Sequence, residues 1–341
     1  VDSPSRPNLF KPAGLMVDGQ FEPGMVVNGV PIGADAFVEA SLQDKVQTLV
    51  SDNKKIISLL QDSEPQSLWS ITRLCRHPVA QHWLRHLPPH LTNAAFAPLQ
   101  ASMDSMVTAS IGTGEWHTDP VVRARMGLPV GDGGGGMIEY SDLGTLAFLG
   151  GLFQIAPELV NRKGPSGVEI SGWADPVFKP VFGHHAFDHD RGGVGAYSGL
   201  CTATSPEGVS WSLSRGLVAG WAALRSSLTA AELKDTILNV DVHNAGHDLG
   251  KAQRALTRAW RRPMVTRFQA KVRSLPVGDP RRMAYMEVAA REEGACVRTI
   301  FSTWPTASQR MLPDQWIVGA CLYFGLRIPA LSTFVGATIG T

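Results

Sequence analysis

Two short clusters of histidine and aspartate are the first residues in this sequence whose types could support chemistry. One is "GHHAFDHD" at 183–190, and the other is "DVHNAGHDLG" at 241–250. His243 and His247 stand four apart, so in a helix both imidazoles would share one face, as in many zinc sites. Asn244 and Gly246 disfavour a helix there, and the glutamate of an HExxH motif is absent. We therefore interpret both clusters as polar loop residues and predict no metal site.

The glycine-rich stretch "RMGLPVGDGGGGMIEYSDLG" at 125–144 is the second candidate for chemistry. A phosphate-binding loop of the GxxxxGK[ST] type needs a Lys and a hydroxyl directly after the glycines. Met137 and Ile138 follow them instead. A dinucleotide fingerprint needs a preceding buried strand, which Leu128-Pro129-Val130 does not favour. The pattern therefore predicts a flexible turn between two elements and not a phosphate site.

Other catalytic patterns are missing from the sequence. It contains no GxSxG nucleophile motif and no adjacent aspartates that could hold the two metal ions of nucleotidyl transfer. Four widely spaced cysteines include no CxxC pair, which favours a reducing intracellular compartment over a disulfide-bonded or zinc-bound domain. We therefore expect neither an enzyme nor a cofactor.

Basic residues are concentrated in two segments, although the whole chain has a formal net charge of only +1. Between 251 and 282, Asp279 is the sole acidic residue, and Trp260 and Phe268 are interleaved with the cations. Spacings of three and four would place several arginines on one helix face, which could follow a phosphate backbone. The alternative is a solvated face paired with acidic residues of the N-terminal third. The candidate nucleic-acid-binding residues are Arg73, Arg76, Arg85, Lys251, Arg254, Arg258, Arg261, Arg262, Arg267, Lys271 and Arg273.

The elements that must position these residues are mostly helices. The 341 residues include 44% hydrophobic and 18% charged residues, which predicts a folded chain, and 35 Gly and 23 Pro predict many short elements. Short apolar runs before residue 33 are typical of a hairpin. Apolar positions recurring every three or four residues, together with capping signals, predict helices. The expected helices cover about 35–60, 65–77, 91–111, 143–152, 213–228, 229–240, 249–275 and 312–325.

The fold class predicted is therefore mainly α, with a small N-terminal β-hairpin and a long irregular Gly/Pro-rich loop at 161–211. No apolar run is long enough for a membrane span. The start "VDSPSRPNLFKP" has neither an initiator Met nor a signal-peptide core, so we expect a processed protein or an incomplete record. The compartment is expected to be intracellular, and removal of an organellar, for example mitochondrial, targeting peptide would fit this start.

Four stretches in order resemble the C-terminal half of reverse-transcriptase-like proteins from non-LTR retrotransposons. They are "VVNGVPIGADAFVEASLQDKV" (27–47 before Gln), "LWSITRLCRHPVAQHWLRHLPP" (68–89), "RMGLPVGDGGGGMIEYSDLGTLAFLGGL" (125–152) and "STWPTASQRMLPDQWIVGACLYFGLRIP" (302–329). The resemblance implies a palm end at 1–33, a thumb-like helical domain at 34–160, a linker at 161–211 and a C-terminal helical domain at 212–341. In that family the thumb and connector grip nucleic acid, whereas the catalytic aspartates lie in the palm and a Cys/His module and nuclease follow.

The resemblance implies a helical thumb and connector bundle without catalytic palm or nuclease. The function expected first is that of a non-catalytic, reverse-transcriptase-derived protein that binds structured RNA or packs into a ribonucleoprotein, for example an organellar ribosome, beside other protein subunits. Two alternatives stay open. The chain could be a structural scaffold subunit of a protein-only complex, or a fragment of an active retroelement polymerase.

Overall fold

The computed structural model of the protein describes residues 13–144, 146–148, 150–151, 203–204, 210–211, 252–279, 281–282, 285, 305–306 and 310–329. In these ranges the fold is mainly helical with a small N-terminal antiparallel sheet, which confirms the predicted fold class. The predicted helices at 213–240 lie outside the described residues. So does most of the predicted irregular segment 161–211, of which a two-stranded pair, β4 (Ala203–Thr204) with β5 (Ser210–Trp211), is described.

The N-terminal sheet is a three-stranded meander rather than the single hairpin expected. Its strands are β1 (Gly14–Val17), β2 (Gln20–Val27) and β3 (Val30–Gly33), paired in that order. Asp18-Gly19 and Asn28-Gly29 form the two connections, and all four residues have positive φ. Positive φ at both central residues defines the two-residue turn that matches the twist of a hairpin, and Asp-Gly and Asn-Gly are its preferred sequences.

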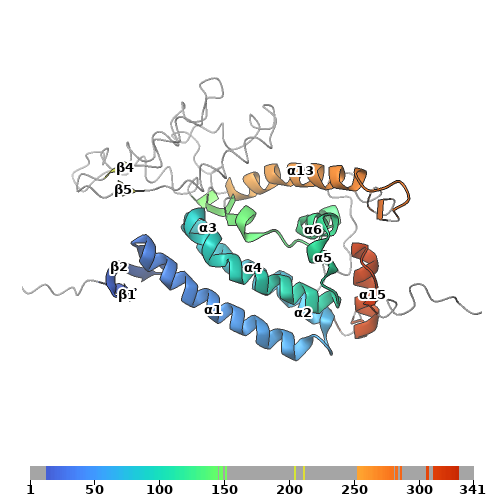
Figure 1. Ribbon diagram of the computed structural model, residues 1–341, viewed down its shortest axis with the longest axis horizontal. Coiled ribbons are helices and arrows are strands. Elements are labelled where there is room, and N and C mark those ends of the chain that lie inside the picture. Colours follow the sequence, from blue (N-terminus) through green and yellow to red (C-terminus); the bar gives the residue numbers. More distant parts are fainter. Residues whose placement is uncertain are drawn as a thin grey trace, which may run out of the picture.

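The main core lies between long helices that cross from the sheet toward the C-terminal helix (Figure 1). Helix α1 (Asp35–Leu60) packs along α4 (Pro89–Ile111) through residues spaced at helical intervals. Between them, the chain makes short turns of helix interrupted near Pro78 and Pro88. These are α2 (Pro65–Ile71), the π-helical turn η1 (Thr72–Arg76), the 3₁₀ turn η2 (His77–Ala80) and α3 (Gln81–His86).

A second group of short elements follows α4. Gly112, with φ of 75°, ends α4 in the left-handed conformation that favours glycine. Two short helices and a 3₁₀ turn come next: α5 (Glu115–Thr118), α6 (Pro120–Gly127) and η3 (Val130–Asp132). Asp119 caps α6, because its carboxylate accepts hydrogen bonds from the amides of Val121 and Val122. The glycine-rich turn leads to helical residues 140–144, 146–148 and 150–151, of which Leu143, Leu146 and Ala147 are buried, as predicted.

Two C-terminal helices pack on this body. Helix α15 (Pro313–Phe324) buries Trp316 and Phe324 against α2 and α4, and it ends at Gly325, as predicted from the sequence. The indole of Trp316 donates to the backbone oxygen of Ser110, and its ring centroid lies 6.4 Å from that of Trp69. Helix α13 (Ala252–Arg273) instead lies on α6. Because α15 shares one core with α2 and α4, described parts of the predicted 34–160 and 212–341 domains are packed together.

Candidate nucleic-acid interface

Helix α13 carries the longer basic segment and is held on the body through one apolar stripe. Phe268 and Val272 are fully buried, four residues apart, against Val121 and Leu128. Tyr285 completes this cluster, with its ring centroid 5.8 Å from that of Phe268. Burying side chains of this size removes apolar area from water and stabilises each contact by about 2 kcal/mol. The stripe therefore fixes which face of α13 points away from the protein.

Ion pairs fasten the same helix and the segment after it. Asp132 accepts bidentate hydrogen bonds from Arg261, and the Asp132 side chain is only 8% exposed. Arg281 contacts both Asp119 and Asp279, and its hydrogen bonds lower the pKa of the Asp279 carboxyl. Lys271 donates to the backbone oxygen of Pro120 at 3.2 Å. Arg261, predicted as a nucleic-acid contact, is therefore committed to holding α13 in place.

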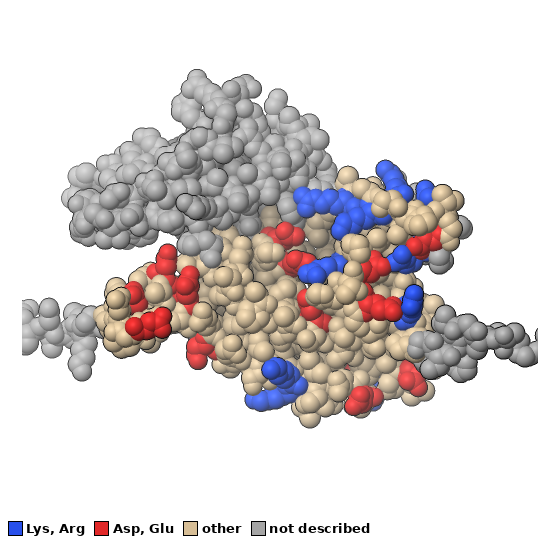
Figure 2. Space-filling model, in the orientation of Figure 1, with Lys and Arg blue, Asp and Glu red and all other residues tan. Residues whose placement is uncertain are grey.

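The opposite face of α13 is exposed and basic. Arg267, Lys271 and Arg273 are exposed, together with the small residues Thr266 and Ala270. Figure 2 shows basic side chains gathered along this helix, with acidic side chains below them. We call Arg267, Lys271 and Arg273 the outer basic group. Its members leave their guanidinium and ammonium groups within reach of a ligand on the surface.

The remaining basic residues predicted on this helix extend the row along the backbone. Arg254, Arg258 and Arg262 are spaced four apart and continue the register of Thr266 and Ala270. Residues four apart in a continuous helix share a face. The backbone therefore places them on the side of the helix where the exposed positions lie. Lys251 lies outside the described residues.

The second predicted basic segment, at 73–86, behaves differently, because its arginines face the interior. Arg76 donates from Nε to the Asn53 side-chain oxygen at 2.6 Å and from Nη2 to the Leu49 carbonyl at 3.1 Å. Arg73 is half-buried against Gly136, and burial lowers the pKa of its guanidinium. Only Arg85, on α3, is exposed. Figure 1 shows α3 far from the C-terminal end of α13, so Arg85 lies apart from the outer basic group.

Asn53 explains why Arg76 turns inward. Its side chain is completely buried on α1, and its amide nitrogen donates to the Ser102 hydroxyl at 3.0 Å on α4. A buried side-chain oxygen without a hydrogen bond costs about 1–3 kcal/mol, and Arg76 supplies the missing donor. Sequence reasoning missed this network, because a lone Asn on an otherwise apolar helix face is its only signal.

The largest miss of sequence reasoning is Arg125, whose side chain is 3% exposed. Its Nε donates to the Gly133 carbonyl at 3.0 Å and its Nη1 to the Tyr323 carbonyl. The guanidinium carbon lies 4.7 Å from the ring centre of Tyr285 and 4.4 Å from that of Tyr323. Cation–π contacts of this kind contribute about 2 kcal/mol when they are shielded from water. Arg125 therefore joins α6, the glycine turn and α15.

This contact also accounts for the glycine run. Gly133 adopts φ of 79°, and its carbonyl accepts from Arg125, while Gly134 and Gly135 are buried. A Cβ on Gly134 would lie 2.1 Å from the Leu128 carbonyl oxygen, and one on Gly135 would lie 2.4 Å from the Met126 sulfur. The turn prediction is confirmed, but glycine is required here by close packing and not by flexibility.

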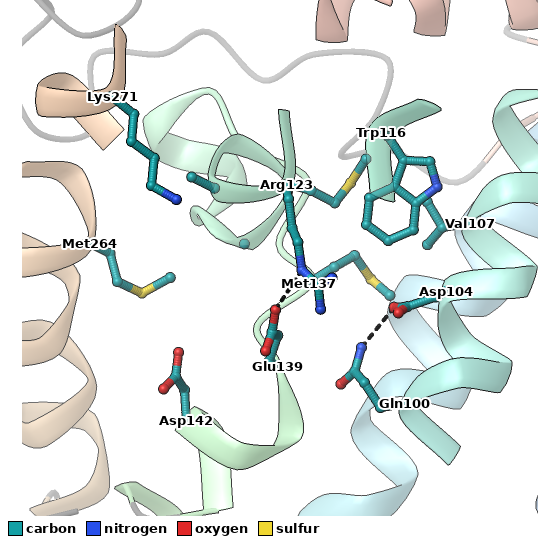
Figure 3. A pocket seen from close by; sticks show the side chains of 13 residues that line it. Gln100, Asp104, Val107, Trp116, Arg123, Met137, Glu139, Asp142, Met264 and Lys271 are labelled. Carbon is teal, nitrogen blue, oxygen red and sulfur yellow. Dashed lines mark hydrogen bonds and ion pairs between the residues drawn. The ribbon is translucent and has the colours of Figure 1, made fainter. Parts of the chain in front are cut away.

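A hollow of about 260 Å³ lies beneath α13, between α4 and α6 (Figure 3). Its acidic residues have partners: Asp104 accepts from Gln100 at 2.8 Å and lies 2.8 Å from His117, and Glu139 accepts from Arg123 at 2.8 Å. Asp142 points toward the hollow from the helical segment after the glycine turn. Its burial and the nearby Glu139 charge raise the pKa of the Asp142 carboxyl, and Arg267 opposes that rise.

The hollow is a charged seam rather than a chemical centre. Arg123, Arg267 and Lys271 offset the carboxylates, so positive and negative groups alternate across the gap between α13 and the body. Among the described residues, no cluster of His, Cys, Asp and Glu is arranged to hold a metal ion. The histidine clusters at 184–190 and 243–247 lie outside them. The acidic residues next to Arg267 lower the positive potential of the outer basic group.

Comparison of the chain with protein-family models, curated proteins and solved structures finds no match. In the part of the chain that the structure describes, no helix combines the length and the apolar character that a membrane crossing requires.

Proposed function

We propose that this chain is a non-catalytic, RNA-contacting component of a ribonucleoprotein, for example an organellar ribosome, and that α13 is the element that meets RNA. One observation carries the proposal: α13 is fastened to the body by Phe268 and Val272, and its basic residues Arg267, Lys271 and Arg273 stay exposed on the other side. The resemblance to the thumb and connector of retrotransposon reverse transcriptases supports the same function.

The physical argument rests on spacing and charge. Arg267 and Lys271 stand four residues apart, which is about 6 Å along a helix axis and close to the separation of successive phosphates in a nucleic-acid strand. Arg offers bidentate donors that match phosphate oxygens, whereas Lys acts as a point charge. Such contacts position a backbone and carry no sequence information. Recognition by this face is therefore expected to depend on RNA shape and charge.

The experiment is a titration of a labelled RNA hairpin with the full chain, followed by fluorescence anisotropy. The test variant replaces Arg267, Lys271 and Arg273 with Gln, and the matched control replaces Lys45 and Lys54, which are exposed on α1, with Gln. Affinity of the natural chain should fall as salt rises from about 50 to about 200 mM, and the test variant should bind weakly with a shallower salt slope. Equal binding by the test variant and the control variant would refute the proposal.

A further inference from the structure

The opposite end of the molecule has the opposite character. Side chains on one face of the N-terminal sheet are apolar and exposed. Paired residues across antiparallel strands, and alternate residues along one strand, share a face. Met16 pairs with Phe21 and Met25 pairs with Ile32, so these four side chains lie together. Their exposed fractions are 67%, 47%, 55% and 54% respectively.

The other side of the sheet supports it from behind. A Cβ on Gly24 would lie 2.2 Å from the Phe37 ring of α1, so that ring packs directly on the strand. At one end, α3 anchors the turn between β2 and β3: Trp83 donates to the Gly29 carbonyl at 2.9 Å, and the His82 ring nitrogen lies 2.9 Å from the Asn28 carbonyl oxygen. Met16, Phe21, Met25 and Ile32 are therefore presented on a sheet held at two places.

The charge around this face is uniformly negative. Between residues 13 and 44 the sequence contains no Lys, Arg or His. Figure 2 shows acidic and no basic side chains on the described surface at this end. The acidic residues of this stretch are Asp18, Glu22, Asp35, Glu39 and Asp44. An acidic rim repels the phosphates of RNA and of anionic lipids, and two such faces would repel each other.

We propose that this sheet face docks an amphipathic helix of a partner protein, with an apolar stripe flanked by Lys and Arg. The dimensions fit one helix: three strands span about 10 Å between the outer two, which is about the diameter of a helix with side chains. Two methionines among the four side chains give a surface that adapts to different apolar partners. The chain's own α13 does not fit this role, because Phe268 and Val272 already use its apolar stripe.

The test uses a labelled peptide of about 18 residues, which matches the length of β2 when helical, with Leu and Lys in an amphipathic pattern. A matched peptide with Glu in place of Lys is the charge control. The natural chain should bind the Leu/Lys peptide in fluorescence anisotropy and bind the Leu/Glu peptide much less. A Phe21→Ser, Met25→Ser variant should bind the Leu/Lys peptide at least about tenfold more weakly.

Leu59→Ser is the matched control variant, because Leu59 is 74% exposed on α1 away from the sheet. Photo-crosslinking of the peptide, read by mass spectrometry, should label residues 14–33. Equal binding of both peptides, equal loss with Leu59→Ser, labelling elsewhere, or self-association of the chain through Met25 and Phe21 would overturn the proposal. Binding of the RNA hairpin by the Phe21→Ser, Met25→Ser variant should be unchanged, which separates this outcome from failure of the α13 proposal.

Discussion

The two basic segments of this chain, at 73–86 and 252–273, have similar composition but different structural roles. In the first, Arg76 binds buried Asn53 and the Leu49 carbonyl, and Arg73 packs against the glycine turn. In the second, only Arg261 is committed to an internal ion pair, with Asp132, among the arginines of α13 whose side chains are described. The difference follows from what each segment packs against: the first crosses α1 and α4 in the main core, whereas the second lies on α6 at the surface.

The comparison teaches that an arginine's role is set by its distant partners. A guanidinium carries five donors and is drawn inward wherever a buried acceptor lacks a hydrogen bond. Asn53 provides such an acceptor for Arg76, and the Gly133 and Tyr323 carbonyls provide two for Arg125. The outer basic group has no comparable buried acceptor within the described contacts. Charge density alone would have assigned both segments to RNA.

Arg125→Ala is expected to have the largest effect. The substitution leaves the Gly133 and Tyr323 carbonyls without their donor and removes the contacts with the rings of Tyr285 and Tyr323. We expect a loss of about 3–5 kcal/mol in the free energy of unfolding, measured by urea denaturation. Arg125→Lys, which keeps the charge but not the planar donors, should lose part of this. A loss under about 1 kcal/mol would show that the interior cation is dispensable.

Arg76→Ala should have the next largest effect, because it leaves the buried Asn53 oxygen without its charged donor. Losing hydrogen bonds to a charged group costs about 1.5–3 kcal/mol. Urea denaturation gives this value, and Arg85→Ala on the exposed side of α3 serves as the control, with a change within about 0.5 kcal/mol. If both variants were equally stable, the inward role of this segment would be wrong.

Asp132→Asn sharpens the comparison from the side of α13. The substitution removes one charge of a partly buried pair, and Arg261 then keeps weaker hydrogen bonds. We expect a loss of about 1–3 kcal/mol in the free energy of opening α13. Hydrogen exchange should therefore be faster in 252–273 and unchanged in α1 and α4. Uniformly faster exchange over the whole chain would contradict a separate attachment of α13.

Asp142→Asn should have the smallest effect and the opposite sign. Because its folded pKa is raised, the carboxyl binds its proton more tightly in the folded state, so it reduces stability at pH values above both the unfolded and folded pKa. Asn should raise the melting temperature at neutral pH, and the gain should vanish as pH falls below about 4, where an unfolded Asp is also protonated. RNA affinity should rise slightly, since Arg267 loses an acidic neighbour. Thermal melts across this pH range would show a constant gain if burial of the charge were unimportant.

Local signals in the sequence were sufficient for much of the fold. The apolar spacing after Asp35, Pro65 at the start of α2 and Gly325 at the end of α15 are read within a few residues, and all three elements agree with prediction. The inner network was not predictable, because Arg125 meets Tyr323 across 198 residues and Arg261 meets Asp132 across 129. Spacing rules carry no information about partners at such distances. The RNA-binding assignments of the outer basic group remain predictions.

The most direct test of the two roles measures stability and RNA affinity together for two single variants. Arg76→Gln and Arg267→Gln make the same chemical change, one in each basic segment. The account predicts that Arg76→Gln lowers the urea midpoint and leaves the hairpin affinity unchanged under conditions where the chain is folded. It predicts that Arg267→Gln keeps the urea midpoint and weakens the affinity. If both variants lost affinity equally, or if Arg267→Gln lost only stability, the division between an inner and an outer basic segment would be wrong.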